Sequence, residues 1–139
     1  MKHLIVALLL TTAWVTGGPA HEQSSEGPVW DLQFIRTKPD QRDAYLASLK
    51  QTAKPVWDEE KRQGLILDYK IFNNLTQHDP QEWDIEVAVE FKNFAALDGF
   101  EAKELSIAGK IAGSQESGGK RGAMREIVST KLIQEIVLK

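Results

Sequence analysis

The clearest pattern along the chain is the alternation of apolar and polar positions between residues 83 and 91. Every second position holds a large apolar residue, and the positions between them are acidic or alanine. The apolar set is Trp83, Ile85, Val87, Val89 and Phe91. A period of two is the repeat of a β-strand, whose successive side chains point to opposite faces. The pattern predicts a strand with its apolar face in the core.

Residues 28–37 show a second alternation. Large apolar side chains at Trp30, Leu32 and Phe34 alternate with the polar Asp31 and Gln33. We expect a strand whose large apolar side chains face the core and whose polar side chains point away from it.

Two further strands are predicted from weaker patterns. Residues 65–72 have one apolar face and one mixed face, on which Asp68 and Lys70 lie between Ile66 and Phe72. The polar segment 73–80 that follows is expected to be a turn. Residues 128–138 place Val128, Leu132, Ile136 and Leu138 on one face of a strand. A helix is the competing interpretation of this last segment.

A helix is predicted between residues 40 and 63, because apolar residues recur there at helical spacing. They are Tyr45, Leu49, Ala53 and Val56. Asp40 is the expected N-cap. Pro55 should kink or split the helix, since it lacks an N–H group and crowds the preceding turn. Gly64 should end it.

A second helix is predicted over residues 94–111, with Asn93 as its N-cap. Its apolar stripe would comprise Phe94, Leu97, Leu105, Ala108 and Ile111. Gly99 and Gly109 weaken the helical pattern.

The glycine-rich stretch 113–122, GSQESGGKRG, invites comparison with a phosphate-binding loop. Such a loop follows a buried strand, and serine or threonine follows its lysine. Here the preceding element is a predicted helix, and Arg121 follows Lys120. We therefore predict no nucleotide site but a mobile loop that leads into a short helical turn near residues 121–126. The basic cluster of Lys120, Arg121 and Arg125 is interpreted as solvated.

The elements follow the order strand, helix, strand, strand, helix, strand. This order predicts an α+β fold of the ferredoxin-like βαββαβ type. Its four-stranded antiparallel sheet would carry both helices on one face.

The N-terminus has the features of a secretory signal peptide. A lysine precedes an apolar run from Leu4 to about Val15, and small residues lie before position 21. The run is shorter than the roughly 20 apolar residues of a spanning helix. We expect an exported protein, periplasmic or secreted, without membrane contact after cleavage. The expected division is a signal peptide over residues 1–20, a flexible leader over 21–27 and one domain over 28–139.

Charge and residue composition restrict the kinds of ligand that this chain is expected to bind. The sequence has 17 basic and 20 acidic residues, and cleavage would leave 16 basic residues against the same 20 acids. Nucleic acid is not an expected ligand, since its binding depends on concentrated positive charge. The chain has no cysteine and no zinc-ligand spacing, and His78 lies in a predicted turn. We expect no metal and no cofactor.

Several segments resemble the dimeric α/β-barrel superfamily, and most narrowly its small exported bacterial members of unassigned function. The resemblance covers most of residues 28–139. It lies in Arg36–Asp40, Tyr45–Leu46, Pro55–Glu60 and Gly64–Phe72. It implies a homodimer in which two sheets face each other across a cavity. Relatives that act on haem rely on a helix histidine, which neither predicted helix contains, so the resemblance implies no haem here.

In such a dimer, polar side chains opposite the helices would line the cavity between the sheets. The ferredoxin-like order makes the first and third strands neighbours, which would bring Asp31 or Gln33 near Glu86, with Lys70 as a counter-charge. Carboxylates held close together raise one another's proton affinity, which suits acid–base chemistry. An ordinary solvated sheet face with salt bridges is the alternative.

Two aromatic residues of the first helix, Trp57 and Tyr45, either pack in the core or close a pocket.

The bare sheet face would also expose Ile35, Ile66 and Phe72 unless a partner covers them, which favours a homodimer.

The function expected from these features is an exported homodimer that binds a small apolar or amphipathic molecule between facing sheets. One alternative is a cofactor-independent enzyme similar to monooxygenases or isomerases, by analogy with the superfamily. A second is a structural homodimer without a ligand.

Overall fold

The computed structural model of the chain describes residues 24–111 and 115–138. The predicted signal peptide, residues 1–20, lies outside the described residues, as do residues 21–23 of the predicted leader.

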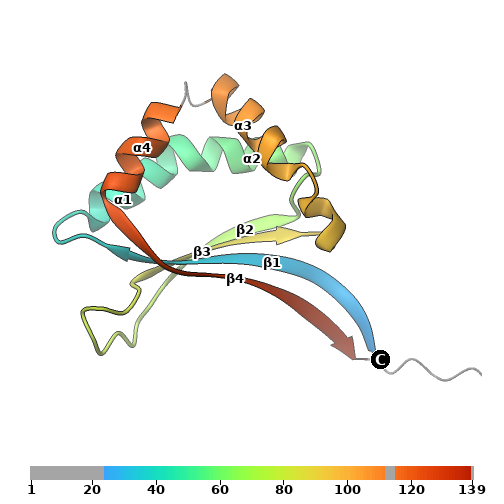
Figure 1. The fold of residues 1–139 in the computed structure, drawn as a ribbon, viewed down its shortest axis with the longest axis horizontal. Coiled ribbons are helices and arrows are strands. Elements are labelled where there is room, and N and C mark those ends of the chain that lie inside the picture. The colour runs from blue at the N-terminus through green and yellow to red at the C-terminus, as the bar shows by residue number, and fades with distance from the viewer. Residues whose placement is uncertain (1–23, 112–114, 139) are drawn as a thin grey trace, which may run out of the picture.

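One antiparallel sheet carries the helices on one of its faces (Figure 1). Its strands are β1 (Ser24–Thr37), β2 (Asp68–Asn73), β3 (Ile85–Phe91) and β4 (Arg125–Leu138). Their order across the sheet is β2-β3-β1-β4, with every neighbouring pair antiparallel. The α+β, ferredoxin-like prediction is confirmed, including the adjacency of the first and third strands.

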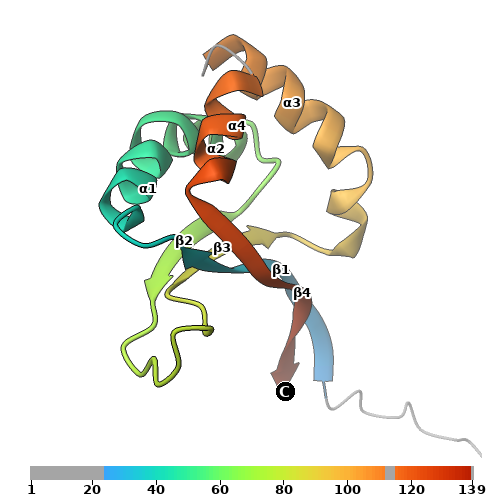
Figure 2. The same cartoon turned by 60° about the vertical axis from the view of Figure 1, so that its left-hand side comes forward.

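β1 and β4 continue together past the other two strands as a long ribbon (Figure 2). The pairing begins at Ser24 with Leu138, so β1 starts four residues before the predicted strand. The prediction of a flexible leader is wrong for residues 24–27. Pairing of residues 24–26 with β4 holds this segment in the strand, although it lacks an alternating apolar pattern.

The first helical region is split into three parts, which agrees with the split expected from Pro55. α1 (Arg42–Ser48) passes into a π-helical turn (Leu49–Ala53) and then α2 (Lys54–Arg62), which has the proline in its first turn. The N–H of Lys54 bonds the carbonyl of Leu49, five residues back, which is the wider π pattern. A proline removes one N–H and pushes on the preceding turn, and the wider turn accommodates both effects.

Of the two predicted ends of this helical region, the C-terminal one is confirmed and the N-terminal one is wrong. Gly64 has φ of 71° and ends α2 as predicted, since glycine adopts this left-handed conformation without strain. Asp40 also has a positive φ, 60°, and lies in the turn. Gln41 is the N-cap residue and makes no side-chain capping bond, so the prediction of an Asp40 cap is wrong.

The second helical region begins as predicted and then breaks. The Asn93 side chain accepts a hydrogen bond from the N–H of Ala96 and caps a short 3-10 helix (Phe94–Leu97). Gly99, with φ of 68°, separates this turn from α3 (Phe100–Ile111).

A further helix, α4 (Gln115–Ala123), occupies most of the glycine-rich stretch. The predicted loop, with a helical turn only from residue 121, is therefore wrong. α4 lies on the same side of the sheet as α2 and α3 (Figure 1). Tertiary position outweighs the low helix propensity of its glycines.

The structure reverses the predicted faces of β1. Val29 and Ile35 are the buried residues of this strand, at 2% and 0% exposure. The register pairs Val29 with Phe91 and Ile35 with Ile85, both buried on β3. Because side chains alternate, Asp31 and Gln33 share this helix-facing side. The opposite side, called here the open face, carries Trp30, Leu32 and Phe34 of β1.

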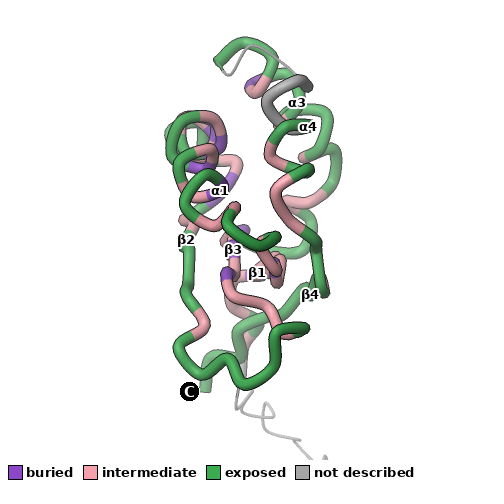
Figure 3. Tube along the Cα trace, turned by 90° about the vertical axis from the view of Figure 1, so that its left-hand side faces the viewer, coloured by how far each residue is buried: buried purple, intermediate pink, exposed green. Residues whose placement is uncertain are grey.

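Most buried residues belong to the helices and to the strands that these helices cover (Figure 3). One cluster surrounds Tyr45 and Ile35, and a second joins Ile66 to Phe91. The predicted exposure of Ile35 and Ile66 is thus wrong, whereas Phe72 is 45% exposed on the open face. Within the described residues, no helix has the length and apolar character needed to cross a membrane.

Candidate functional site

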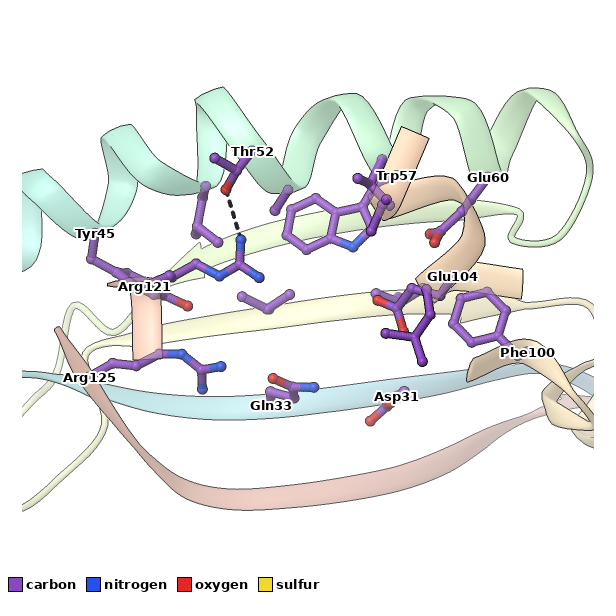
Figure 4. A pocket seen from close by; sticks show the side chains of 18 of the residues that line it. Asp31, Gln33, Tyr45, Thr52, Trp57, Glu60, Phe100, Glu104, Arg121 and Arg125 are labelled. Atoms are coloured by element: carbon purple, nitrogen blue, oxygen red, sulfur yellow. Dashed lines mark hydrogen bonds between the residues drawn. The ribbon is translucent and has the colours of Figure 1, made fainter. Parts of the chain in front are cut away.

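A cavity of about 580 Å³ lies between the helices and the helix-facing side of the sheet (Figure 4). α1, the π-helical turn, α2, α3 and α4 contribute to its wall, together with β1, β3 and the start of β4. The cavity has an apolar middle and two charged ends.

Aromatic and aliphatic side chains line the cavity from its middle to its acidic end. Trp57 of α2 is held in place by Tyr69 of β2, with ring centroids 5.0 Å apart. Phe100 of α3 packs edge-on against Phe91 at 4.8 Å. Val87 and Val89 form part of the sheet side of the wall. These residues offer an apolar surface to a bound molecule.

Two arginines form the basic end of the cavity. Arg121 projects from α4, and its Nη1 donates to the hydroxyl oxygen of Thr52 at 2.9 Å. Arg125, the first residue of β4, lies over the ring of Tyr45 with 6.0 Å between its guanidinium carbon and the ring centroid. The Nε of Arg125 is buried and has no hydrogen-bond partner.

Three carboxyl groups form the acidic end. Glu60 points from α2 into the cavity, is 0% exposed, and neither of its carboxyl oxygens has a hydrogen-bond partner. Glu104 comes from α3 and Asp31 from β1, and Oδ1 of Asp31 is also buried without a partner. A buried polar atom without a partner is costly, so such atoms mark places where a ligand or water completes the bonding.

Burial changes the acidity of these groups. Loss of solvent raises the pKa of Glu60 to about 7, and the negative charge of Glu104 adds to the effect. Burial likewise raises the pKa of Asp31. It also raises the pKa of Glu104, against which the positive charge of Arg121 acts. Carboxyl groups that hold a proton near neutral pH are typical of functional sites.

The unpartnered atoms are concentrated here. Within residues 24–111 and 115–138, four buried side-chain nitrogen or oxygen atoms lack a hydrogen-bond partner: Oδ1 of Asp31, both carboxyl oxygens of Glu60, and Nε of Arg125. All four belong to residues that line this cavity.

The structure separates the residues predicted to share a site. Asp31, Gln33, Tyr45 and Trp57 all line the helix–sheet cavity. Glu86 and Lys70 lie on the open face, because Glu86 pairs with Phe34 and Lys70 with Ala88 in the sheet. The predicted proximity of Asp31 to Glu86 is therefore wrong, since the two side chains point to opposite sides of one sheet. A cavity between two facing sheets involves a second copy and stays a prediction.

The sequence interpretation did not select Glu60, Glu104, Arg121 or Arg125 as site residues. Two of them were detectable. The predicted apolar stripe of the first helix ends at Val56. Glu60 lies one turn further along the same buried face, so the helical spacing points to it. Glu104 occupies the same helix face as Phe100 and Ala108. Arg121 and Arg125 belong to the basic cluster that the sequence analysis interprets as solvated. That interpretation is wrong for these two residues, because both line the cavity.

A second hollow, of about 790 Å³, lies where the turn after β1 meets the loop between β2 and β3, and it includes His78. Several of its charged groups have partners within the chain, such as the Arg42 side chain, which donates to Asn73 at 3.0 Å and lies 3.8 Å from Asp84. Among the described residues, no group of three or more His, Cys, Asp or Glu side chains is arranged to hold a metal ion.

Comparisons with known proteins agree on the fold. A dimeric ferredoxin-like protein from an uncultured marine organism is 15% identical, with a TM-score of 0.55, over 82% of this chain and 98% of that chain. A second such protein from an uncultured marine organism is 11% identical, with a TM-score of 0.53, over 83% and 90%. The chain matches no family model and no curated protein. The structural likeness shows that the chain has a ferredoxin-like fold.

Proposed function

We propose that the chain is an exported homodimer in which the helix–sheet cavity of each subunit binds a small amphipathic organic anion. The observation that carries this proposal is the set of buried, unpartnered polar atoms inside a cavity with apolar walls. The donors and acceptors of such a site lack partners, and a bound ligand can supply them.

The two arginines support an anionic group on the ligand. A guanidinium carries five N–H donors, and Arg121 uses one of them on Thr52. Arg125 keeps its Nε unpaired although it is buried. Desolvated guanidinium groups favour a carboxylate or a similar planar anion, which accepts two parallel hydrogen bonds.

The size and wall of the cavity support a small organic body on the ligand. About 580 Å³ lies within the range of roughly 300–1,000 Å³ that is usual for small-molecule sites. Trp57 supplies a flat apolar surface between the charged ends, and Phe100 adds one at the acidic end.

The homodimer is proposed from the open face of the sheet. This face carries Trp30, Leu32 and Phe34 of β1, which are only half-buried, and Ile133 of β4, which is 49% exposed. Lys70 lies over the ring of Trp30 at 5.0 Å, where the aromatic face attracts its positive charge. Such a surface is apolar enough to be covered by a second copy. Structures of the same fold are described as dimeric.

Export is proposed from the sequence of residues 1–20. Intact-mass measurement of protein recovered outside the cytoplasm should give a chain that begins at His21. Recovery of exported chains that still carry residues 1–20 would contradict the proposal.

The binding proposal is tested with decanoate and decanol as matched probes. Decanoate should bind at the basic end, and Arg121→Gln should weaken its affinity at least tenfold, which corresponds to roughly 1.4 kcal/mol. Lys110→Gln, an exposed change on α3, is the control and should leave the affinity unchanged. Decanol lacks the charge, so the Arg121 change should affect it much less. Absence of decanoate binding to the parent protein would contradict the proposed function.

A further inference from the structure

The acidic end of the cavity indicates which chemical group the ligand carries at the end away from its anion. We propose that Glu60, Glu104 and Asp31 receive a protonated amine, so that the ligand is an elongated zwitterion with its anion at Arg121 and Arg125. This inference rests on the proposed function, because it takes the same cavity as the binding site. It goes beyond it by naming a second charged group on the ligand and the distance between the two groups.

Glu60 has two buried carboxyl oxygens that can accept hydrogen bonds from a ligand. Its side chain is 0% exposed, and neither carboxyl oxygen has a partner. Figure 4 shows it pointing into the cavity near Glu104, with Asp31 below them on β1. A protonated amine brings three N–H donors and one positive charge, so it can bond carboxyl groups from three different elements at once.

The charges around Glu60 favour a cation over a neutral donor. Glu104 faces it from α3, and Asp31 lines the same end from β1. The neighbouring Lys61 is exposed and bonds Asp68 at 2.8 Å, outside the cavity. Arg121 and Arg125 are the basic residues that line the cavity, and both lie at its other end. Three acids that share a poorly solvated end repel one another when ionised, and a bound cation relieves that repulsion.

The helix sets the distance between the two charged ends. Arg121 bonds Thr52, and Glu60 lies eight residues further along the same helical region. At a rise of about 1.5 Å per residue, the two positions are roughly 12 Å apart. A saturated chain advances about 1.25 Å per bond, given C–C bonds of about 1.5 Å. An anion and an amine separated by about ten bonds therefore fit both ends.

Binding of an amine should release protons. Burial and the charge of Glu104 raise the pKa of Glu60 to about 7, so its carboxyl group is partly protonated at neutral pH. A cation beside the group stabilises the carboxylate and lowers its pKa on binding. At pH 7 the expected release is about half a proton per site, which is the protonated fraction of such a group.

The experiment compares 10-aminodecanoate, decanoate and decylamine by titration calorimetry at pH 7 in two buffers with different ionisation enthalpies. The aminodecanoate should bind at least tenfold more tightly than decanoate and should release protons, while decanoate releases none. Glu60→Gln and, separately, Glu104→Gln should reduce both the tenfold preference and the proton release. Asp43→Asn, an exposed change on α1 outside the cavity, should alter neither.

The outcomes separate this inference from the proposed function. Equal binding of decanoate and aminodecanoate, or a preference that survives both Glu60→Gln and Glu104→Gln, overturns the zwitterion and leaves the anion site intact. Failure of all three probes to bind overturns both. Tight binding of decylamine alone, unaffected by Arg121→Gln, overturns the anion site and with it the zwitterion.

Discussion

The residue that most distinguishes this chain is Glu60, an acid placed on the buried stripe of a helix. Leu49, Ala53 and Val56 precede it at helical spacing and pack in the core or line the cavity. An apolar residue at position 60 would complete the stripe without desolvating a carboxyl group. Burial of a carboxyl group without a hydrogen-bond partner instead lowers the stability of the fold, and this effect on the free energy of unfolding is measurable.

Glu60→Gln should change the pH dependence of stability. The pKa of Glu60 in the fold, about 7, lies above its ordinary value of 4.5, so the unfolded chain loses the proton first. The stability of the parent protein should therefore fall as the pH rises from about 4.5 to about 7, by up to roughly 3 kcal/mol. Glutamine removes this contribution, so the variant should be the more stable protein at pH 8 and similar at pH 4.5, as measured by urea denaturation.

Glu59→Gln is the matched control on the neighbouring residue. Hydrogen bonds from Arg62 and Gln63 lower the pKa of Glu59 to about 2. Its contribution to stability is present above pH 4.5 and is lost below it, so the change should leave the slope between pH 4.5 and 7 as in the parent protein. An unchanged slope in Glu60→Gln would contradict the burial of an unpartnered carboxyl group.

At the scale of elements, α4 is the part of the chain that the local sequence describes least well. Its glycines favour a loop, yet it forms a helix that delivers Arg121 to the cavity. Glycine in a helix costs about 1 kcal/mol relative to alanine. The helix therefore depends on its position against the rest of the molecule.

Gly119→Ala should stabilise the protein by up to about 1 kcal/mol, because an added Cβ meets nothing within 4 Å and alanine favours the helix. A loop at this position would make the same change nearly neutral. Gly64→Ala provides the contrast: it also has open space around the Cβ, but its φ is +71°. Alanine there should cost roughly 1–2 kcal/mol. Both values are accessible from urea denaturation at one pH, and equal effects of the two changes would contradict the assigned conformations.

At the scale of the whole molecule, the helices cover one face of the sheet and leave the other face uncovered in the single chain. The open face has aromatic and aliphatic side chains from β1, β2 and β4, with charged groups among them. Burial raises the pKa of Glu86 on this face even in one chain. A second copy would deepen that burial.

Ile133→Glu should convert the proposed dimer to a monomer. Ile133 is opposite Trp30 in the register of β4 and β1 and is 49% exposed, so a charge there would be desolvated only in the dimer. Leu75→Glu is the control, because Leu75 is 86% exposed in the loop after β2. Light scattering at micromolar concentration should report half the parent mass for the first variant and the parent mass for the second. A monomeric parent protein would contradict the proposed assembly.

The sequence alone determined the features that depend on local chemistry. The strand at 85–91 follows from alternation, the cap at Asn93 from a short polar side chain, and the ends of the helical segments from Pro55 and Gly64. Each involves residues a few positions apart, so its energetics are contained in one stretch of chain. The order of these elements was then sufficient for the ferredoxin-like topology.

Only the tertiary structure decided which face of β1 is buried and where the site lies. Both faces of β1 carry apolar residues, and the register with β3 selects the one that holds Val29 and Ile35. That selection moves Asp31 beneath the helices. The cavity then unites Asp31, Glu60, Glu104 and Arg121 from four elements. The perturbed acidity of its carboxyl groups arises from desolvation and from charges distant in sequence, and neither exists until the chain has packed.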